Sequence, residues 1–170
     1  MEFMEIVKSR YACRSFDGRP VKKEQLDTIL EAGRLAPTAK NLQEQRVYVI
    51  QSPEMLAKID RVTPCRYEAK TVVVVAFDKN RVFIYPGEER DSGIEDAAIV
   101  ATHMILAARS VGVDSCWINL FDPAVMAQTL GLPEYEEVLM MLDLGYASED
   151  SVPSSNHYLR RPLSETTVYL

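Results

Sequence analysis

The sequence predicts a layered domain in which helices cover a β-sheet, of either the mixed α/β or the α+β class. Four short apolar runs with strand character alternate with four or five segments of helical spacing, and this interleaving is typical of sheets packed against helices. Hydrophobic residues make up 47% of the chain and charged residues 26%, as in ordinary globular proteins. The 170 residues contain no repeat or linker, so we expect a single domain over residues 1–170.

Two helices are expected in the first part of the chain. A short helix begins near Met4 and ends near Arg10. A longer helix covers residues 22–35, and Pro37 stops it because proline cannot continue the hydrogen-bond pattern. Helical spacing puts on one face of the longer helix the residues Leu26, Ile29, Leu30 and Gly33.

Three further helices are expected later in the sequence. Ser52-Pro53 and Asp122-Pro123 each provide an N-cap followed by a first helical residue, and the helices that they open end at Ile59 and Gly131. The longest helical pattern covers residues 91–111, and a glycine follows it as a C-cap. Its apolar stripe consists of Ile94, Ala97, Ala101, Met104, Ile105, Ala108 and Val111.

Strands are expected where β-branched and aromatic residues cluster, at residues 46–50, 71–77, 115–119 and 138–144. Residues 71–77 are apolar on both faces, so this strand should lie in the centre of the sheet. The tail over residues 151–170 is polar at first but ends in Val-Tyr-Leu, which indicates that it packs against something.

Charge and cysteine usage exclude several classes of protein. The net charge of −6 argues against a nucleic-acid partner, because phosphate backbones are bound by clustered cations. The three cysteines, Cys13, Cys65 and Cys116, have no metal-ligand spacing, and we expect reduced thiols in the cytoplasm and no bound metal. The first residues do not resemble a signal peptide, and the longest apolar run is too short to cross a membrane.

Arginines near turns are the main chemical signal of the sequence. It contains neither of the glycine-rich nucleotide-binding motifs, no G-x-S-x-G motif, and no spacing that pairs its histidines with a nucleophile. Arg10 and Arg14 bracket Tyr11, and Arg160 and Arg161 are adjacent in the tail. Guanidinium groups match phosphate oxygens in a bidentate manner, so these side chains are candidates for a phosphate site. The alternative is that all four are solvated surface arginines.

Four segments, in order along the chain, resemble the nitroreductase family. The first is KSRYACRSFDGRPVKKEQLDTILEAGRLAPTAKNLQ, which resembles the family's Arg-rich turn, helix and Ala-Pro-Ser/Thr-x-x-Asn-x-Gln motif. GIEDAAIVATHMILAARSVGVDSCWINLFD resembles the family's long central helix and the strand beside the flavin. LGLPEYEEVLMMLDLGYASED and LRRPLSETTVYL resemble the two closing segments of the family. Each segment alone is a weak signal, but the ordered set covers nearly the whole chain.

The resemblance implies an α+β, three-layer nitroreductase-like fold, with a mainly antiparallel sheet, helices on both faces and an extended C-terminal tail. It implies bound FMN, reduced by NAD(P)H, that passes electrons in a ping-pong reaction to a nitroaromatic, a quinone or a similar acceptor. It also implies a homodimer with FMN in the interface and the tail wrapped around the partner. The flavin would carry the chemistry, so no catalytic side chain is required.

The resemblance also implies which residues contact FMN. Those implied for the phosphate and ribityl chain are Arg10, Tyr11, Ala12, Arg14, Arg160 and Arg161. Those implied to line the flavin from the other subunit, or to lie close to it, are Pro37, Thr38, Ala39, Asn41 and Gln43. Those implied for the reactive edge are Cys116, Trp117 and Ile118, together with the backbone N–H groups of Asn119 and Leu120.

Some positions depart from the family pattern. Glu44-Gln45 stands where the family usually has Pro-Trp, and Asn119-Leu120 stands where a glycine often ends the flavin-edge strand. The lysine that often helps to bind the phosphate has no clear counterpart, and Arg66 is the candidate replacement. Three alternatives therefore stay open: a specialised relative that dehalogenates or destroys flavin, a flavin-binding or flavin-storing protein with weak turnover, and an unrelated α/β domain without a cofactor.

Overall fold

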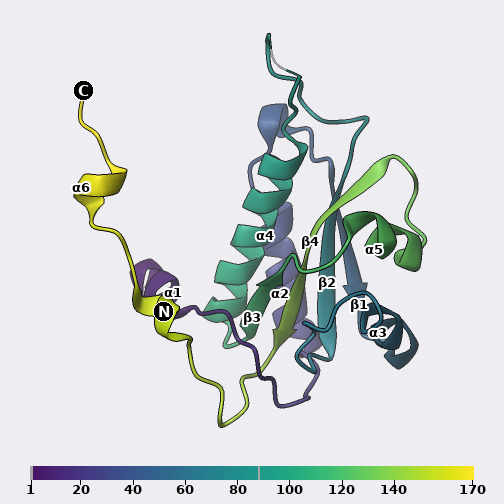
Figure 1. The fold of residues 1–170 in the computed structure, drawn as a ribbon, viewed down its shortest axis with the longest axis vertical. Helices are drawn as coiled ribbons and strands as arrows, with labels where there is room; N and C mark the ends of the chain where they lie inside the picture. The colour runs from purple at the N-terminus through teal and green to yellow at the C-terminus, as the bar shows by residue number, and fades with distance from the viewer. Residues whose placement is uncertain (1, 88) are drawn as a thin grey trace.

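The computed structural model describes residues 2–87 and 89–170, and these residues form a four-stranded antiparallel sheet (Figure 1). The strands lie in the order β1 (Gln45–Ile50), β2 (Thr71–Asp78), β4 (Glu136–Gly145) and β3 (Asp114–Ile118), and each neighbouring pair is antiparallel. All eight residues of β2 are buried, which confirms the prediction of a central strand. The mainly antiparallel sheet is confirmed as well.

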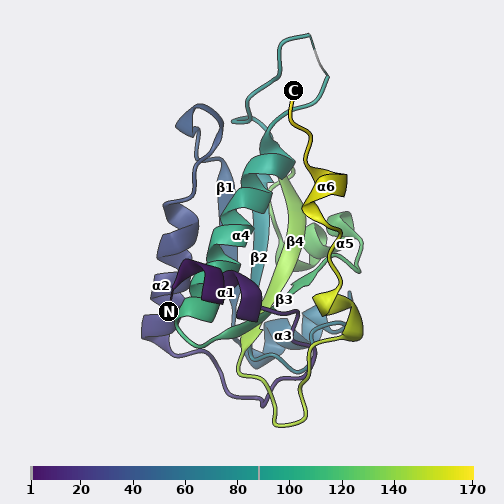
Figure 2. The ribbon, with the colours of Figure 1, turned by 90° about the vertical axis from the view of Figure 1, so that its left-hand side faces the viewer.

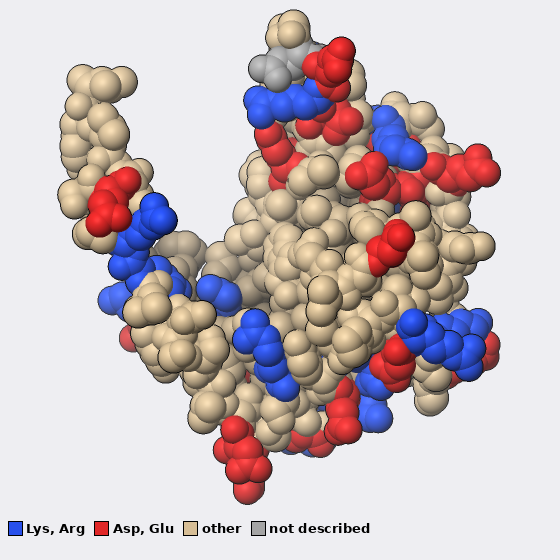
Figure 3. All heavy atoms as spheres, in the orientation of Figure 1, with Lys and Arg blue, Asp and Glu red and all other residues tan. Residues whose placement is uncertain are grey.

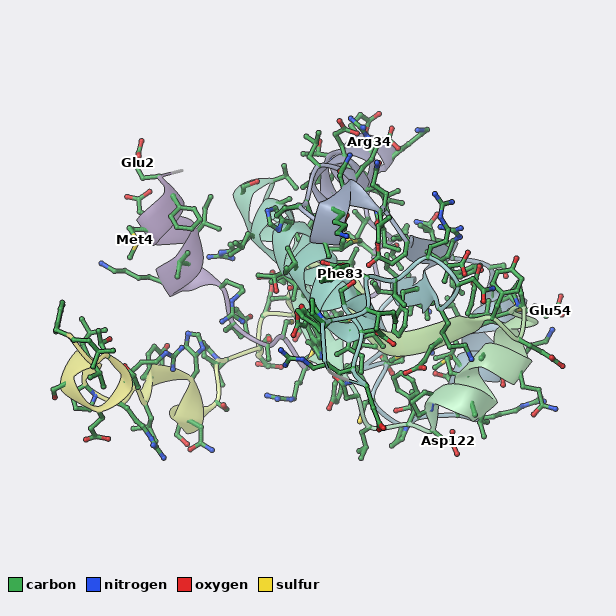
Figure 4. The ribbon with its side chains drawn as sticks, turned by 90° about the horizontal axis from the view of Figure 1, so that it is seen from above. Glu2, Met4, Arg34, Glu54, Phe83 and Asp122 are labelled. Atoms are coloured by element: carbon green, nitrogen blue, oxygen red, sulfur yellow. The ribbon has the colours of Figure 1, made fainter. Side chains whose placement is uncertain are left out.

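Helices cover both faces of this sheet, so the predicted three layers are present. Residues of α2 (Lys23–Arg34) and α4 (Gly93–Ser110) enclose one apolar cluster, and residues of α3 (Pro53–Ile59) and α5 (Pro123–Leu130) enclose the other. Viewed from above, Arg34 at the end of α2 and Asp122 before α5 lie on opposite sides of the molecule (Figure 4). On the first face α2 packs closely on α4, because Gly33 leaves room for the side chain of Met104.

The predicted helix ends follow from local hydrogen bonds. The Ser52 hydroxyl accepts the N–H of Met55 at 3.3 Å, and the Asp122 carboxylate accepts the N–H of Ala124 at 2.8 Å. Gly131, which caps α5, has a φ of +68° in the left-handed region, where a residue without Cβ is favoured. The sequence therefore predicted both the starts and the stops of these helices for the right physical reasons.

The structure corrects parts of the sequence interpretation. Ile94, predicted to lie in the buried stripe of the long helix, is 55% exposed and lies on the outer face of α4. The helix is apolar around most of its circumference, so spacing alone did not separate its inner and outer faces. Three short elements were not expected: η1 (Ala39–Asn41), η2 (Ser155–Tyr158) and α6 (Leu163–Thr166).

The two ends of the chain together form an arm. Helix α1 (Phe3–Ser9) and the segment that carries η2 and α6 stand out from the layered body on the side of α4 (Figures 1 and 2). The side chains of Leu163, Val168, Tyr169 and Leu170 are each at least 79% exposed. The apolar end of the tail, which the sequence predicts to pack, therefore does not pack within its own chain.

Candidate functional site

A cationic pocket lies within the arm, where α1 meets η2. It has a volume of about 550 Å³, and its lining includes Arg10, Arg160, Lys8 and His157. Figure 3 shows lysine and arginine side chains gathered along this arm. Arg10 and Arg160 are 150 positions apart in the sequence, yet they face the same pocket. Such a concentration of cationic donors favours an anionic ligand.

Short contacts between the two ends of the chain position this pocket. The Tyr11 hydroxyl lies 3.2 Å from the Ser151 hydroxyl, and the ring of Tyr11 meets the ring of His157 edge-on, with 6.4 Å between centroids. The Arg160 guanidinium donates hydrogen bonds to the carbonyls of His157 and, at 2.7 Å, Leu159. These contacts curl the tail around the guanidinium and tie it to the segment that follows α1.

The next residues run along the outer edge of β3. Ala12 forms a parallel bridge with Ser115, and the Cys13 N–H donates to the Ser115 carbonyl at 3.0 Å. Burial raises the pKa of the Cys116 thiol to about 12, the nearby Asp143 adds to the rise, and the positive charge of Arg14 opposes it. Arg14 is itself exposed beside the buried thiol, and Arg161 is exposed outside the lining of the pocket.

The loop of residues 37–43 has an unusual backbone. Lys40, Asn41 and Gln43 have φ values of 51°, 56° and 54°, in the left-handed region that residues with a Cβ rarely adopt. Side chains accept two of the backbone hydrogen bonds in this loop: the Ala39 N–H donates to Asp96 Oδ1 at 2.9 Å, and the Gln43 N–H donates to Thr38 Oγ1 at 3.1 Å. Pro37 is exposed at its start. Conformations of this kind concentrate at functional sites.

The flavin-edge segment suggested by the resemblance lies at the end of β3. Ile118 is 5% exposed and anchors the strand, Trp117 is half-buried, and Leu120 is 68% exposed. The Asn119 side chain is fixed on both sides, since its amide donates to the Leu139 carbonyl at 3.0 Å and its oxygen accepts the indole N–H of Trp117. The segment thus presents a fixed asparagine and an exposed leucine.

Arg66 is already engaged in other contacts. Its guanidinium donates to the two carboxylate oxygens of Asp60 at 2.6 and 2.7 Å, and to the Ala69 carbonyl at 2.7 Å. A side chain with these three hydrogen bonds would have to break them before it could bind a phosphate. The idea that Arg66 replaces the family's lysine therefore gains no support from the geometry, and Lys8 in the cationic pocket is the better-placed cation.

The two candidate regions lie at opposite ends of α4. The 37–43 loop is attached at Asp96 in the first turn, and α1 is attached at Arg109, which donates to the Ser9 hydroxyl at 3.0 Å in the last turn. At a rise of about 1.5 Å per residue these two attachment points are about 20 Å apart along the helix. A single chain therefore does not bring the two regions together.

Comparison with known proteins decides the family. The model of the nitroreductase family matches residues 7–67 and 66–146. The chain belongs to the nitroreductase family. A solved nitroreductase family protein from Clostridium difficile 630 is 35% identical, with a TM-score of 0.92, over 99% of this chain and 98% of that chain.

Two other relatives carry names that mention the flavin. A solved nitroreductase with bound FMN from Bacteroides fragilis NCTC 9343 is 25% identical, with a TM-score of 0.79, over 100% of this chain and 99% of that chain. The FMN reductase (NAD(P)H) of Bacillus subtilis (strain 168) is 29% identical over 86% of this chain and 68% of its own length. The predicted family and its fold are thus confirmed.

Two parts of the site were not predicted from the sequence. Lys8 and His157 in the cationic pocket were not singled out, although each lies within three positions of a predicted arginine. The buried carboxyl of Asp96 was missed too, although an acid stands here in phase with the buried residues of α4. Residues 2–87 and 89–170 contain no helix long and apolar enough to cross a membrane, and no group of three or more His, Cys, Asp or Glu suited to a metal ion.

Proposed function

We propose that this protein is an FMN-dependent oxidoreductase, and the observation that carries the proposal is the cationic pocket at Arg10 and Arg160. Guanidinium and ammonium groups suit a phosphate dianion, and the pocket offers both in one place. Bound FMN would supply hydride acceptance from NAD(P)H and, in a second step, electron delivery to a nitroaromatic, a quinone or a similar acceptor. The bound FMN of the relative from Bacteroides fragilis supports the proposal.

The residues of this chain have separate tasks in the proposed site. Arg10 and Arg160, assisted by Lys8, bind the phosphate, while Tyr11 keeps the tail in place through Ser151. The 37–43 loop lines the flavin, and its left-handed residues give it a defined shape. The end of β3 presents Asn119 and Leu120 towards the reactive edge, where backbone N–H groups stabilise negative charge. The remaining sequence assignments stay predictions. They are Ala12, Arg14 and Arg161 on the phosphate side, and Cys116 to Ile118 along β3.

We propose further that the site is completed by a second copy of the chain. The outer face of α4 exposes Ile94 and Ile99, and a hollow of about 230 Å³ on this face is lined by Ala98, Ile99, Thr102 and His103. If two copies of α4 pack antiparallel around a two-fold axis, the first turn of one helix approaches the last turn of the other. The 37–43 loop of one chain then meets the cationic pocket of its partner, and the exposed tail has a surface to cover.

The spectrum of the purified protein tests this function. We expect a yellow protein that releases FMN rather than FAD, and that oxidises NADH or NADPH faster when nitrofurazone or menadione is added. We expect it to work in the cytoplasm, because its three cysteines are free and thiols stay reduced there. A colourless protein that does not bind added FMN at micromolar concentration would refute the function. A yellow protein without turnover would instead be a flavin-storing protein.

A further inference from the structure

Two buried carboxyl groups lie together beneath the 37–43 loop, where the family pattern would have proline. Glu44 follows the loop directly and is 0% exposed, and Asp96 in the first turn of α4 is 4% exposed. One oxygen of each has a hydrogen-bond donor: Asp96 Oδ1 accepts the Ala39 N–H at 2.9 Å, and Glu44 Oε1 lies 3.5 Å from the Ser92 hydroxyl. The other two oxygens, Glu44 Oε2 and Asp96 Oδ2, are buried without a hydrogen-bond partner.

A single proton held between the two carboxyl groups would give both unpaired oxygens a hydrogen-bond partner. An ionised carboxylate can only accept hydrogen bonds, whereas a protonated carboxyl donates one. Two adjacent carboxylates in a dry interior cannot both stay ionised without strong repulsion, so one of them retains its proton. Burial raises the pKa of Glu44 to about 7, and the neighbouring carboxyl group of Asp96 adds to the rise.

The charged groups around the pair are engaged elsewhere. From β1, Arg46 donates to the backbone carbonyls of Glu44 and Gln45. Its guanidinium also forms ion pairs, with 3.5 Å from Nη2 to Asp78 Oδ2 and 3.5 Å from Nε to Glu136 Oε1. From the loop, Lys40 lies over the ring of Phe83, 4.6 Å from its centroid. Beyond Asp96 on α4, Glu95 accepts a hydrogen bond from Tyr85. With these groups engaged, burial and the neighbouring Asp96 carboxyl group determine the protonation of Glu44.

The geometry points to Glu44 and Asp96 as positioning residues that share one proton and thereby hold the 37–43 loop in its left-handed conformation. Because Asp96 binds the loop through the Ala39 N–H, a shift of Asp96 away from an ionised Glu44 releases the loop. This inference rests on the proposed function in one respect, namely that the loop lines the flavin. Flavin affinity then depends on pH through a pair that never touches the flavin.

The direction of the pH effect follows from the raised pKa. In the unfolded chain Glu44 titrates near its ordinary value of 4.5, and in the folded chain near 7. The folded state therefore holds the proton more tightly, and the stability that the pair contributes is complete below about 4.5 and lost as the pH rises towards about 7. FMN affinity should fall as the pH rises above about 7, because the loop needs the proton.

The test compares FMN binding by the wild type and Glu44→Gln between pH 6 and pH 9. Glutamine keeps the size and donates an N–H to Asp96, but it does not titrate. We expect the wild-type dissociation constant to rise by up to roughly tenfold per pH unit above neutrality, and that of Glu44→Gln to show no such rise. Glu54→Gln on the exposed side of α3 should behave as wild type, and FMN's own phosphate ionisation affects all three alike. An equal pH dependence in wild type and Glu44→Gln would overturn the inference.

Unfolding of the flavin-free protein separates this inference from the proposed function. Between about pH 4.5 and pH 7 the wild type should lose stability that Glu44→Gln keeps, whether or not any flavin binds. If no FMN binds at any pH, the proposed function fails, while the unfolding curves still decide whether the pair shares a proton. If Glu44→Gln does not fold, Asp96→Asn replaces it: removal of the neighbouring charge should lower the pH at which stability is lost. An unchanged pH midpoint in Asp96→Asn would contradict proton sharing.

Discussion

At the scale of single residues, two arginines from opposite ends of the sequence should act on the same phosphate. Replacing Arg10 or Arg160 with alanine should weaken FMN binding by roughly tenfold to a hundredfold, because a charge-assisted hydrogen bond contributes about 1.5–3 kcal/mol. Riboflavin has no phosphate, so its affinity should change little. Titration of both ligands, followed by flavin fluorescence, checks the prediction.

The matched control for these variants is Arg34→Ala on α2. Arg34 is an exposed arginine that pairs with Glu31 at 2.6 Å, on a different element from the cationic pocket. We expect no change in either affinity for this variant. Equal losses of FMN and riboflavin affinity in Arg10→Ala and Arg160→Ala would show that these arginines do not bind the phosphate.

A second residue-scale prediction concerns Asp143, which is buried in the centre of the sheet. It pairs with Val72 and Cys116 in the neighbouring strands, is 0% exposed, and has two oxygens without hydrogen-bond partners. Burial raises its pKa to about 9, although the charge of Arg66 opposes the rise. The folded state therefore holds this proton more tightly than the unfolded state, and stability falls as the pH rises from the ordinary value of 3.8 towards about 9.

Urea unfolding between pH 8 and pH 9 separates this effect from that of Glu44, which is largely ionised above pH 8 because its pKa is about 7. The wild type should lose up to about 1.4 kcal/mol per pH unit in this window. Asp143→Asn has no proton to lose at this position, so its stability should fall less steeply with pH than that of the wild type. Parallel slopes for the two proteins would mean that Asp143 does not carry the buried proton.

At the scale of elements, the contact between α4 and β2 depends on a glycine. A Cβ added at Gly93 would lie 2.2 Å from the ring of Phe77, a side chain that is 2% exposed and cannot move aside. Gly93→Ala should therefore destabilise the fold by about 1–3 kcal/mol, as overpacking of a core usually does. Ser110→Ala at the exposed end of the same helix should have little effect. Urea unfolding would contradict the argument if Gly93→Ala were as stable as the wild type.

Most elements were predictable because their signals are local. Ser52 and Asp122 with the prolines that follow them, and Gly131 at the end of α5, fix helix ends through contacts within a few residues. Ile94 was misplaced because α4 is apolar on its outer face as well, and nothing in its spacing says which face packs against the sheet. The helical turns η1, η2 and α6 are shorter than the period on which a hydrophobic pattern depends.

The site was predictable only in part, for a related reason. The arginines and the 37–43 loop were found through a resemblance, and the structure adds that Arg10 and Arg160 share a pocket. The contact between Glu44 and Asp96 links residues more than fifty positions apart, and it depends on how α4 packs against the start of β1. A contact between residues so far apart in the sequence leaves no periodic signal along the chain.

At the scale of the whole molecule, we propose that each FMN site is built from two chains. The points on α4 where α1 and the 37–43 loop attach are about 20 Å apart along the helix, and the tail stands out from the body (Figure 1). Two classes of defective chain can therefore be made: Arg10→Ala/Arg160→Ala lacks the phosphate half, and Thr38→Ala/Asn41→Ala lacks the loop half. In a dimer formed from one chain of each class, one site receives both defects and the other receives none.

The most direct measurement is the FMN content of this mixed dimer, co-expressed with two different affinity tags and purified over both. We predict that each defective protein alone retains little FMN, and that the mixed dimer binds one FMN with nearly wild-type affinity. Sedimentation equilibrium of the same sample confirms that it is a dimer. If the mixed dimer binds no more FMN than its two parents, or if the wild type is a monomer that holds FMN tightly, the site lies within one chain and the two-chain proposal is wrong.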